Sequence, residues 1–341
     1  MSVLVGKLRK SALVSYGLFA FWLILMAALH LVTPFLTVLF SYLALSKLNF
    51  FHRKWIALLL FVILVTGAFC GFVYFFNRAF VALPEIVSTS IPVVVKFAAK
   101  HGIELPFADI ESLKALALES VSEAMGYLGN FAKVATKEFV FLLIGIVVAI
   151  GIFLNPALDW DSCKGGSLSN LYSVLCAEIS ERFRSFYMSF ETVIGAQVLI
   201  SSINTVLTAF FVYGGSLKHA TVIVILTFVC GLLPVVGNLL SNSMIVGIAF
   251  TISPQRAGWA LVFLVVVHKL EYFLNSRIIG SRIKHPMWLM LFALVLGERL
   301  MGIGGIILAP VLLHFLKTEA MKVPVTPVLV DPAQALEPAI K

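Results

Sequence analysis

Apolar runs long enough to cross a lipid bilayer constrain this chain more than any other feature. Several of them reach or exceed about 18 residues, the length that a spanning helix requires. Hydrophobic residues make up 60% and charged residues 12% of the 341 positions, and the mean hydropathy is +1.03. Only helices and closed barrels satisfy their backbone inside lipid, and the alternating pattern of barrel strands is absent. The sequence therefore predicts an all-α polytopic integral membrane protein.

The apolar runs divide into about eight membrane segments, two of them broken or hairpin-like. Pro34 breaks the first run, which predicts a tight pair of helices at 12–31 and 35–46 and not a cleaved signal peptide. Apolar residues at helical spacing predict two amphipathic helices, at 109–131 and at 169–190, the second with its charged residues on a solvated face. The expected division is an N-terminal hairpin with a third span at 1–76, an extracytoplasmic amphipathic segment at 77–137, a fourth span at 138–155, a cytoplasmic amphipathic segment at 156–190, a C-terminal membrane bundle at 191–316 and a proline-rich disordered tail at 317–341.

The net charge of +8 has two readings, nucleic-acid binding and membrane topology. The basic residues cluster in short loops beside apolar runs and form no surface stripe, so the positive-inside rule explains them better. We therefore expect a multi-pass protein of the inner (cytoplasmic) membrane with both termini in the cytoplasm. Its expected partners are the lipid bilayer and a small polar solute. We do not expect it to bind nucleic acid.

Catalytic and cofactor motifs are absent from the sequence. It contains no P-loop, no G-x-S-x-G elbow and no HExxH. The four cysteines are scattered and form no Cys-x-x-Cys pair, which argues against a zinc site or a disulfide framework. We expect no enzyme activity, no cofactor and no metal.

Polar side chains recur on one face of the apolar segment at 191–213. Gln197, Ser201 and Asn204 follow one another at offsets of four and three, and Thr208 continues the stripe. In lipid such groups need hydrogen-bond partners, which either neighbouring helices or water along a transport path can provide. Both interpretations, helix-to-helix bonding and path lining, stay open at this point.

The apolar run at 220–252 is interrupted by Pro234, Gly237 and Asn238. Pro234 removes a backbone donor, and Gly237 permits unusual torsions, so polar backbone is left that lipid cannot satisfy. This pattern predicts a hairpin or a broken helix. The run at 288–316 is likewise too long for one ordinary span.

Charges and glycines interrupt that last run, which predicts a second hairpin. Glu298 and Arg299 precede Gly302 and Gly305, so the two charges form either a buried gate pair or the exposed tip of the hairpin. Two interrupted elements that flank one ordinary span often mark the binding site of a transporter near the bilayer midplane.

Ionisable residues also lie at the end of the span before this run, where His268, Glu271 and Asn275 share one helical face. A charge at bilayer depth costs about 2.5 to 3.5 kcal/mol on insertion scales, so such residues face a bundle interior or a water-filled cavity. A histidine beside a carboxylate can exchange a proton near neutral pH. The alternative is that Glu271 pairs with a basic residue or lies at the cytoplasmic interface.

Several of these residues also form a recurrent pattern: Pro234 and Gly237, Glu271, Gly280, His285-Pro286, Gly302 and Gly305, and Ala309-Pro310. The pattern resembles the autoinducer-2 exporter family of polytopic membrane proteins, and the weaker likeness runs from Leu13 to Leu316. The chain departs from it at His268-Lys269, where glutamine is common, and at Ser276, where proline is common. The resemblance implies export of a small polar signal such as autoinducer-2 in some relatives and sodium/proton exchange in others.

We interpret the chain as a secondary, exporter-like permease for a small polar solute or signal molecule, with proton or sodium coupling left open. The candidate path or gating residues are Gln197, Ser201, Asn204, Pro234, Gly237, Asn238, His268, Glu271, Asn275, Glu298, Arg299, Gly302, Gly305 and Pro310. The alternative is an oligomeric channel-like or scaffold membrane protein without coupled transport. Assembly into a homo-oligomer is open in both cases.

Overall fold

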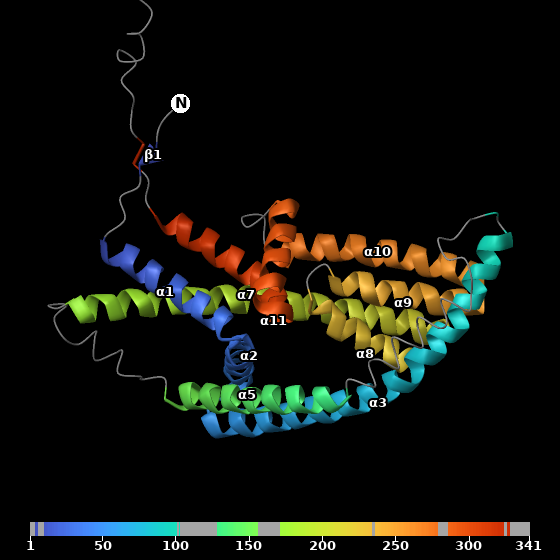
Figure 1. The fold of residues 1–341 in the computed structure, drawn as a ribbon, viewed down its shortest axis with the longest axis horizontal. Helices are drawn as coiled ribbons and strands as arrows, with labels where there is room; N and C mark the ends of the chain where they lie inside the picture. The colour runs from blue at the N-terminus through green and yellow to red at the C-terminus, as the bar shows by residue number, and fades with distance from the viewer. Residues whose placement is uncertain are drawn as a thin grey trace, which may run out of the picture. The chain divides into compact units, whose positions relative to one another are not determined.

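A computed structural model describes residues 4–5, 10–100, 102, 128–155, 171–233, 236–278, 286–323 and 326–327, and they are almost entirely helical. The helices are α1 (Lys10–Ala28), α2 (Val32–Leu48), α3 (Lys54–Lys100), α5 (Leu128–Leu154), α7 (Leu171–Gly214), α8 (Ala220–Gly231), α9 (Val236–Ile252), α10 (Pro254–Ile278) and α11 (Met287–Lys322) (Figure 1). The two-residue strands β1 (Leu4–Val5) and β2 (Thr326–Pro327) pair in antiparallel fashion. The predicted all-α membrane class is confirmed.

Four helices within these described ranges are long and apolar enough to cross a membrane. They cover 54–78, 136–154, 171–214 and 288–322, and residues 12–28 with 32–48 raise the number to five when counted as one broken span. Helix α8 and residues 241–252 of α9 are apolar but shorter. Helix lengths alone therefore do not confirm the expected count of about eight spans.

The chain forms two compact units, and α7 contributes to both. The first unit combines Met1–Val32, Asn155–Glu191 and His285–Lys341. The second unit combines Thr33–Leu154 with Thr192–Lys284. Each unit therefore joins segments that are distant in sequence.

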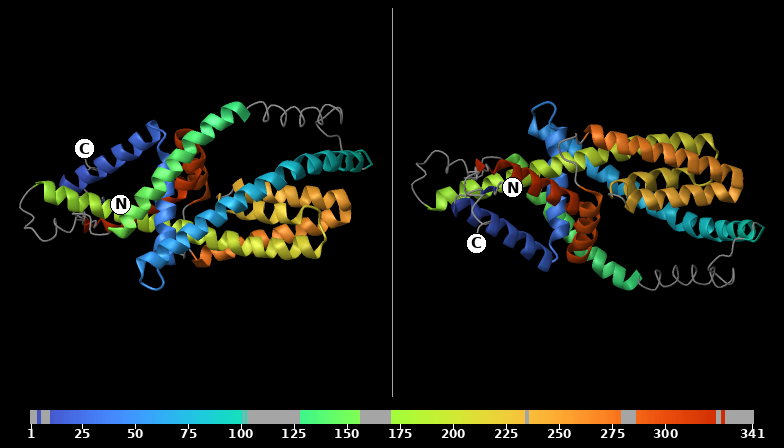
Figure 2. Two further views of the ribbon diagram at one scale, coloured as in Figure 1. Left: turned by 90° about the horizontal axis from the view of Figure 1, so that it is seen from below. Right: turned by 90° about the horizontal axis from the view of Figure 1, so that it is seen from above.

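The second unit has two apolar cores. In one, α2, α3 and α5 pack around Leu45, Phe61 and Phe153. In the other, the C-terminal half of α7 packs with α8, α9 and α10, which lie side by side in Figures 1 and 2. The rings of Phe211 and Phe263 stack there with their centroids 4.3 Å apart. This second core supports the polar stripe of α7.

Helix α3 differs from the expected third span, because it passes Phe76 and continues through Pro84 and Pro92 to Lys100. A proline inside a helix removes one backbone hydrogen bond and crowds the preceding turn, which a long helix can absorb by bending. Figure 1 shows α3 curving along its length. The amphipathic helix expected at 109–131 falls largely on 103–127, outside the described residues.

Helix α7 also differs from expectation, because it joins the predicted amphipathic helix at 169–190 and the following span into one continuous helix of 44 residues. No glycine or proline lies between Glu178 and Ile194 to end it. At a rise of about 1.5 Å per residue such a helix is about twice as long as the hydrocarbon core is thick. All of its charged residues lie in the N-terminal half.

Helix α11 contains the interruption that the sequence predicts. Gly302 has φ 60° and ψ −146°, which breaks the helix into two arms. A Cβ atom on Gly297 would lie 2.5 Å from the carbonyl oxygen of Gly305, so the arms meet where neither residue has a side chain. The second arm contains the buried Pro310 and continues to Lys322, so residues 317–322, expected in the tail, form its last turns.

Candidate functional site

The polar stripe of α7 lies in the second unit, and most of it is buried. Ser201, Asn204 and Thr208 are each less than 5% exposed, and Gln197 is half-buried. A helix places residues at these offsets on one face, as the sequence predicted. The partners of each side chain separate the stripe into two parts with different roles.

Gln197 and Ser201 bind the end of α8. Gln197 Nε2 donates to the carbonyl of Gly231 over 2.7 Å, and Ser201 Oγ donates to the carbonyl of Phe228 over 2.8 Å. Both carbonyls belong to the last turn of a helix, where no intrahelical donor remains. A Cβ atom on Gly231 would lie 2.5 Å from Ser201 Oγ, so glycine is required for this approach. These two side chains join helices.

Asn204 is different, because its hydrogen bonding is incomplete. Its Nδ2 atom lies 3.5 Å from Oε2 of Glu271 on α10, at the long limit of a hydrogen bond. Its Oδ1 atom is buried and has no hydrogen-bond partner among the described residues. Glu271 is half-buried and makes a further contact of its own. A buried acceptor without a donor costs about 1 to 3 kcal/mol, so it calls for an explanation.

The other candidates near Glu271 are less closely associated. His268 is exposed, and no described contact joins it to Glu271, so the expected His268–Glu271 exchange has no support in this geometry. Asn238 and Asn275 belong to α9 and α10, but their side chains lie outside the described part of the structure. Pro234 lies outside the described residues altogether.

The break between α8 and α9 is present, and Gly237 is buried beside it as the second residue of α9. The reason for glycine at this position differs from the one expected, since Gly237 has no positive φ. A Cβ atom there would lie 1.5 Å from the carbonyl oxygen of Cys230, which no side chain can tolerate. Close approach of two backbone segments, and not an unusual torsion, requires glycine.

Glu298 and Arg299 lie on α11 just before the kink at Gly302, and both are exposed. This placement favours the exposed tip over the buried gate pair. Gly305 lies in the second arm, against Gly297 of the first.

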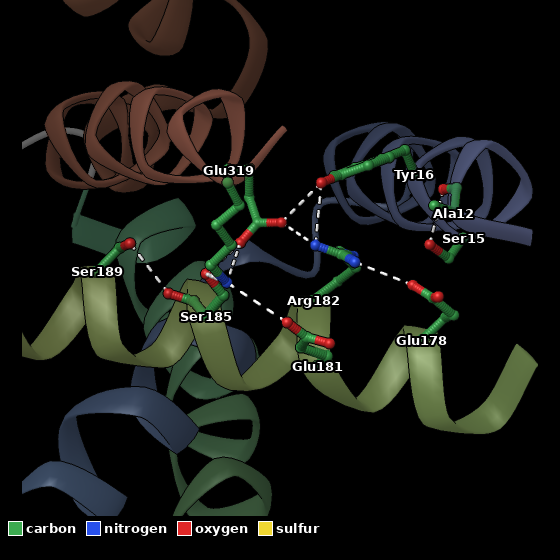
Figure 3. Close-up of polar contacts among 10 residues, drawn as sticks. Ala12, Ser15, Tyr16, Glu178, Glu181, Arg182, Ser185, Ser189 and Glu319 are labelled. Atoms are coloured by element: carbon green, nitrogen blue, oxygen red, sulfur yellow. Dashed lines mark hydrogen bonds and ion pairs between the residues drawn. The ribbon is translucent and has the colours of Figure 1, made fainter. Parts of the chain in front are cut away.

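A second polar cluster, which we call the Glu319 network, lies in the first unit and was not anticipated from the sequence (Figure 3). Glu319 on α11 and Arg182 on α7 are 3% and 6% exposed and form an ion pair. The hydroxyl of Tyr16 on α1 donates to Glu319 over 2.8 Å and accepts from Arg182 over 2.9 Å. Arg182 also pairs with Glu178 at 2.9 Å. Three helices are thereby joined.

The carboxylate of Glu319 accepts hydrogen bonds on both of its oxygens. Oε1 of Glu319 accepts from Ser185 over 2.5 Å and from Lys322 over 2.7 Å, while Oε2 accepts from Tyr16 and Arg182. The guanidinium of Arg182 also lies 4.5 Å from the centre of the Tyr16 ring, in cation–π contact. Apolar rings pack nearby, with Phe19 in contact with the rings of Trp22, Phe183, Phe186 and Phe315.

Sequence spacing could not reveal this network. Arg182 is 137 positions from Glu319 and 166 positions from Tyr16. The charged residues around Arg182 were expected on a solvated face, and Glu319 was expected in a disordered tail. The one local signal is that Glu319 and Lys322 are three residues apart at the end of an apolar run.

Comparison with known proteins agrees with the membrane fold and the motif pattern. The family model described as "AI-2E family transporter" matches residues 12–322. A protein of Bacillus subtilis (strain 168) named "Putative transport protein YdbI" is 24% identical over 274 residues, which cover 76% of this chain and 73% of that protein. A protein of Thermotoga maritima with the name "Putative transport protein" is 23% identical over 308 residues, which cover 83% of this chain and 94% of that protein. The chain therefore belongs to the AI-2E family of membrane transporters.

Proposed function

We propose that the chain is a secondary, exporter-like permease of the inner membrane whose solute path passes Asn204 and Glu271. The observation that carries this proposal is the buried Oδ1 atom of Asn204, an acceptor that no described residue satisfies. Polar groups inside a membrane bundle are costly, and those left unsatisfied are suited to a passing ligand or ion. Membership in a transporter family also supports a transport function.

The other candidate residues take narrower roles in this proposal. Gln197 and Ser201 hold the end of α8 against α7, so they position the path and do not line it. The break beside Gly237 is one of the interrupted elements expected from the sequence, and interrupted helices often mark transporter sites. Glu298 and Arg299 are proposed as gating residues at the kink of α11, where both are exposed.

Solute release from sealed vesicles tests this function. Vesicles that contain the purified full chain are loaded with a panel of radiolabelled polyols, sugars and amino acids, and efflux is compared with that from empty vesicles. We expect faster efflux of at least one small polar solute, and a loss of most of that efflux in Asn204→Leu. The matched control is Ser202→Ala, because the half-buried Ser202 hydroxyl bonds only its own helix, at the carbonyl of Val198.

Two results would count against the proposal. Equal efflux from loaded vesicles with and without the protein would favour the scaffold alternative. Efflux that Asn204→Leu leaves unchanged would retain a transporter and remove Asn204 from its path.

A further inference from the structure

The pairing of Asn204 with Glu271 is chemically incomplete when the carboxyl group is ionised. An ionised carboxylate can only accept hydrogen bonds, so it can satisfy the amide NH₂ group of Asn204 but not its oxygen. The Nδ2 to Oε2 distance of 3.5 Å is also well beyond the range of about 2.7 to 2.9 Å for a strong charge-assisted bond. This pairing therefore leaves the buried amide oxygen of Asn204 without a donor among the described residues.

One proton completes this pair. A protonated carboxyl group has one O–H donor and keeps acceptor capacity on its other oxygen. It can donate to Oδ1 of Asn204 while it accepts from Nδ2, so both ends of the amide are satisfied. We propose that Asn204 and Glu271 form a proton-binding site, in which Glu271 carries the proton and Asn204 accepts its hydrogen bond.

Few ionisable residues lie on α7 to α10 in this core, and Glu271 makes a further contact of its own. The ionisable residues are Tyr213 on α7 between 192 and 214, Cys230 on α8, none on α9, and Arg256, His268, Lys269, Tyr272 and Arg277 on α10 beside Glu271 itself. His268 and Lys269, the nearest of these whose side chains are described, are exposed.

A metal ion fits this site less well than a proton. Hard cations take six or more oxygen ligands. Here Nε2 of Gln197 and the hydroxyl of Ser201 donate to carbonyls of α8, and the described contact at the site joins one amide to one carboxylate. No group of three or more His, Cys, Asp or Glu residues that could hold a metal occurs among the described residues.

This assignment rests on the proposed path through Asn204 and Glu271, and it would make solute movement dependent on pH. Its test needs no solute, so it can fail or succeed independently of the flux assay. Infrared difference spectra are recorded between neutral and acid pH on lipid films of the full chain. The wild type is compared with Glu271→Gln, whose amide resembles the protonated carboxyl group in shape and carries no charge.

We expect the wild type to show the carbonyl band of a protonated carboxylic acid that Glu271→Gln lacks. Asn204→Asp adds a second carboxylate at the same place, and two neighbouring carboxylates share a proton, so the midpoint of that band should rise by about one pH unit or more. Gel filtration shows whether each variant keeps its fold.

Three results would overturn the proton site. The first is an acid band that persists in Glu271→Gln, and the second is a midpoint of that band that is unchanged in Asn204→Asp. The third is a wild-type spectrum that responds to sodium chloride at fixed pH and not to pH itself. Failure of wild-type solute efflux with the Glu271 band intact would instead overturn the proposed transport function alone.

Discussion

Two carboxylates in this molecule, the buried Glu319 and the half-buried Glu271, have different surroundings. Glu319 in the first unit receives hydrogen bonds on both oxygens, from Tyr16, Arg182, Ser185 and Lys322. Glu271 in the second unit faces an amide at 3.5 Å whose oxygen has no described donor. A satisfied polar network in a low-dielectric interior fixes one arrangement of its helices, whereas a partly satisfied one costs stability. The first arrangement is suited to holding structure and the second to binding.

The largest loss of stability is expected from a variant of the Glu319 network. Glu319→Ala leaves the buried guanidinium of Arg182 with Glu178 as its remaining ion-pair partner, and removal of one member of a buried pair costs about 3 to 5 kcal/mol. We expect the free energy of unfolding in detergent to fall by that amount. Glu298→Ala, at an exposed carboxylate of the same helix, should change it by less than about 0.5 kcal/mol. Equal losses in the two variants would contradict the importance of the network.

A smaller loss is expected where the polar stripe holds α8. Gly231→Ala would place a Cβ atom 2.5 Å from Ser201 Oγ and 3.1 Å from Ser201 Cβ. Such overpacking costs about 1 to 3 kcal/mol. The double variant with Ser201→Ala should recover part of the loss, since it removes the hydroxyl that clashes, and a double-mutant cycle measures the coupling. Strictly additive losses would show that the two residues do not meet.

Tyr16→Phe tests one contact within the Glu319 network. It deletes the hydroxyl that bonds Glu319 and Arg182 but keeps the ring beside the guanidinium. Hydrogen bonds to charged groups contribute about 1.5 to 3 kcal/mol, and we expect a loss near the lower end, because Arg182 and the other donors remain. Tyr16→Leu also removes the ring and should destabilise further in the same denaturation assay. A Leu variant as stable as the Phe variant would show that the cation–π contact contributes nothing.

What the sequence could predict follows from local rules. Apolar run length gives the fold class, and Gly302 marks a real break because its backbone must adopt a positive φ. Helical offsets correctly place Ser201 and Asn204 on one buried face. The same offsets gave Glu271 a neighbour on its own helix, His268, and could not give Asn204, because spacing along one helix identifies only residues of that helix. The partner Asn204 is 67 positions away, and only the packing of α7 with α10 brings it near.

The smallest change in stability is expected for Asn204→Leu, and this variant tests the difference between Glu271 and Glu319 most directly. Asn204→Leu removes one long hydrogen bond and one unsatisfied acceptor and fills a similar volume with an apolar group. Loss of one hydrogen-bond partner costs most when the other is left buried and unsatisfied, but the half-buried Glu271 loses only this long contact. We therefore expect a free energy of unfolding within about 0.5 kcal/mol of the wild type, together with at least a tenfold loss of solute efflux. Glu319→Gln should show the reverse, because it weakens a network that holds helices and touches no proposed path. If Asn204→Leu instead destabilises the protein as much as Glu319→Ala does, then the Asn204 amide has a structural role despite its unsatisfied oxygen. The distinction between Glu319 as a structural carboxylate and Glu271 as a binding carboxylate would then be wrong.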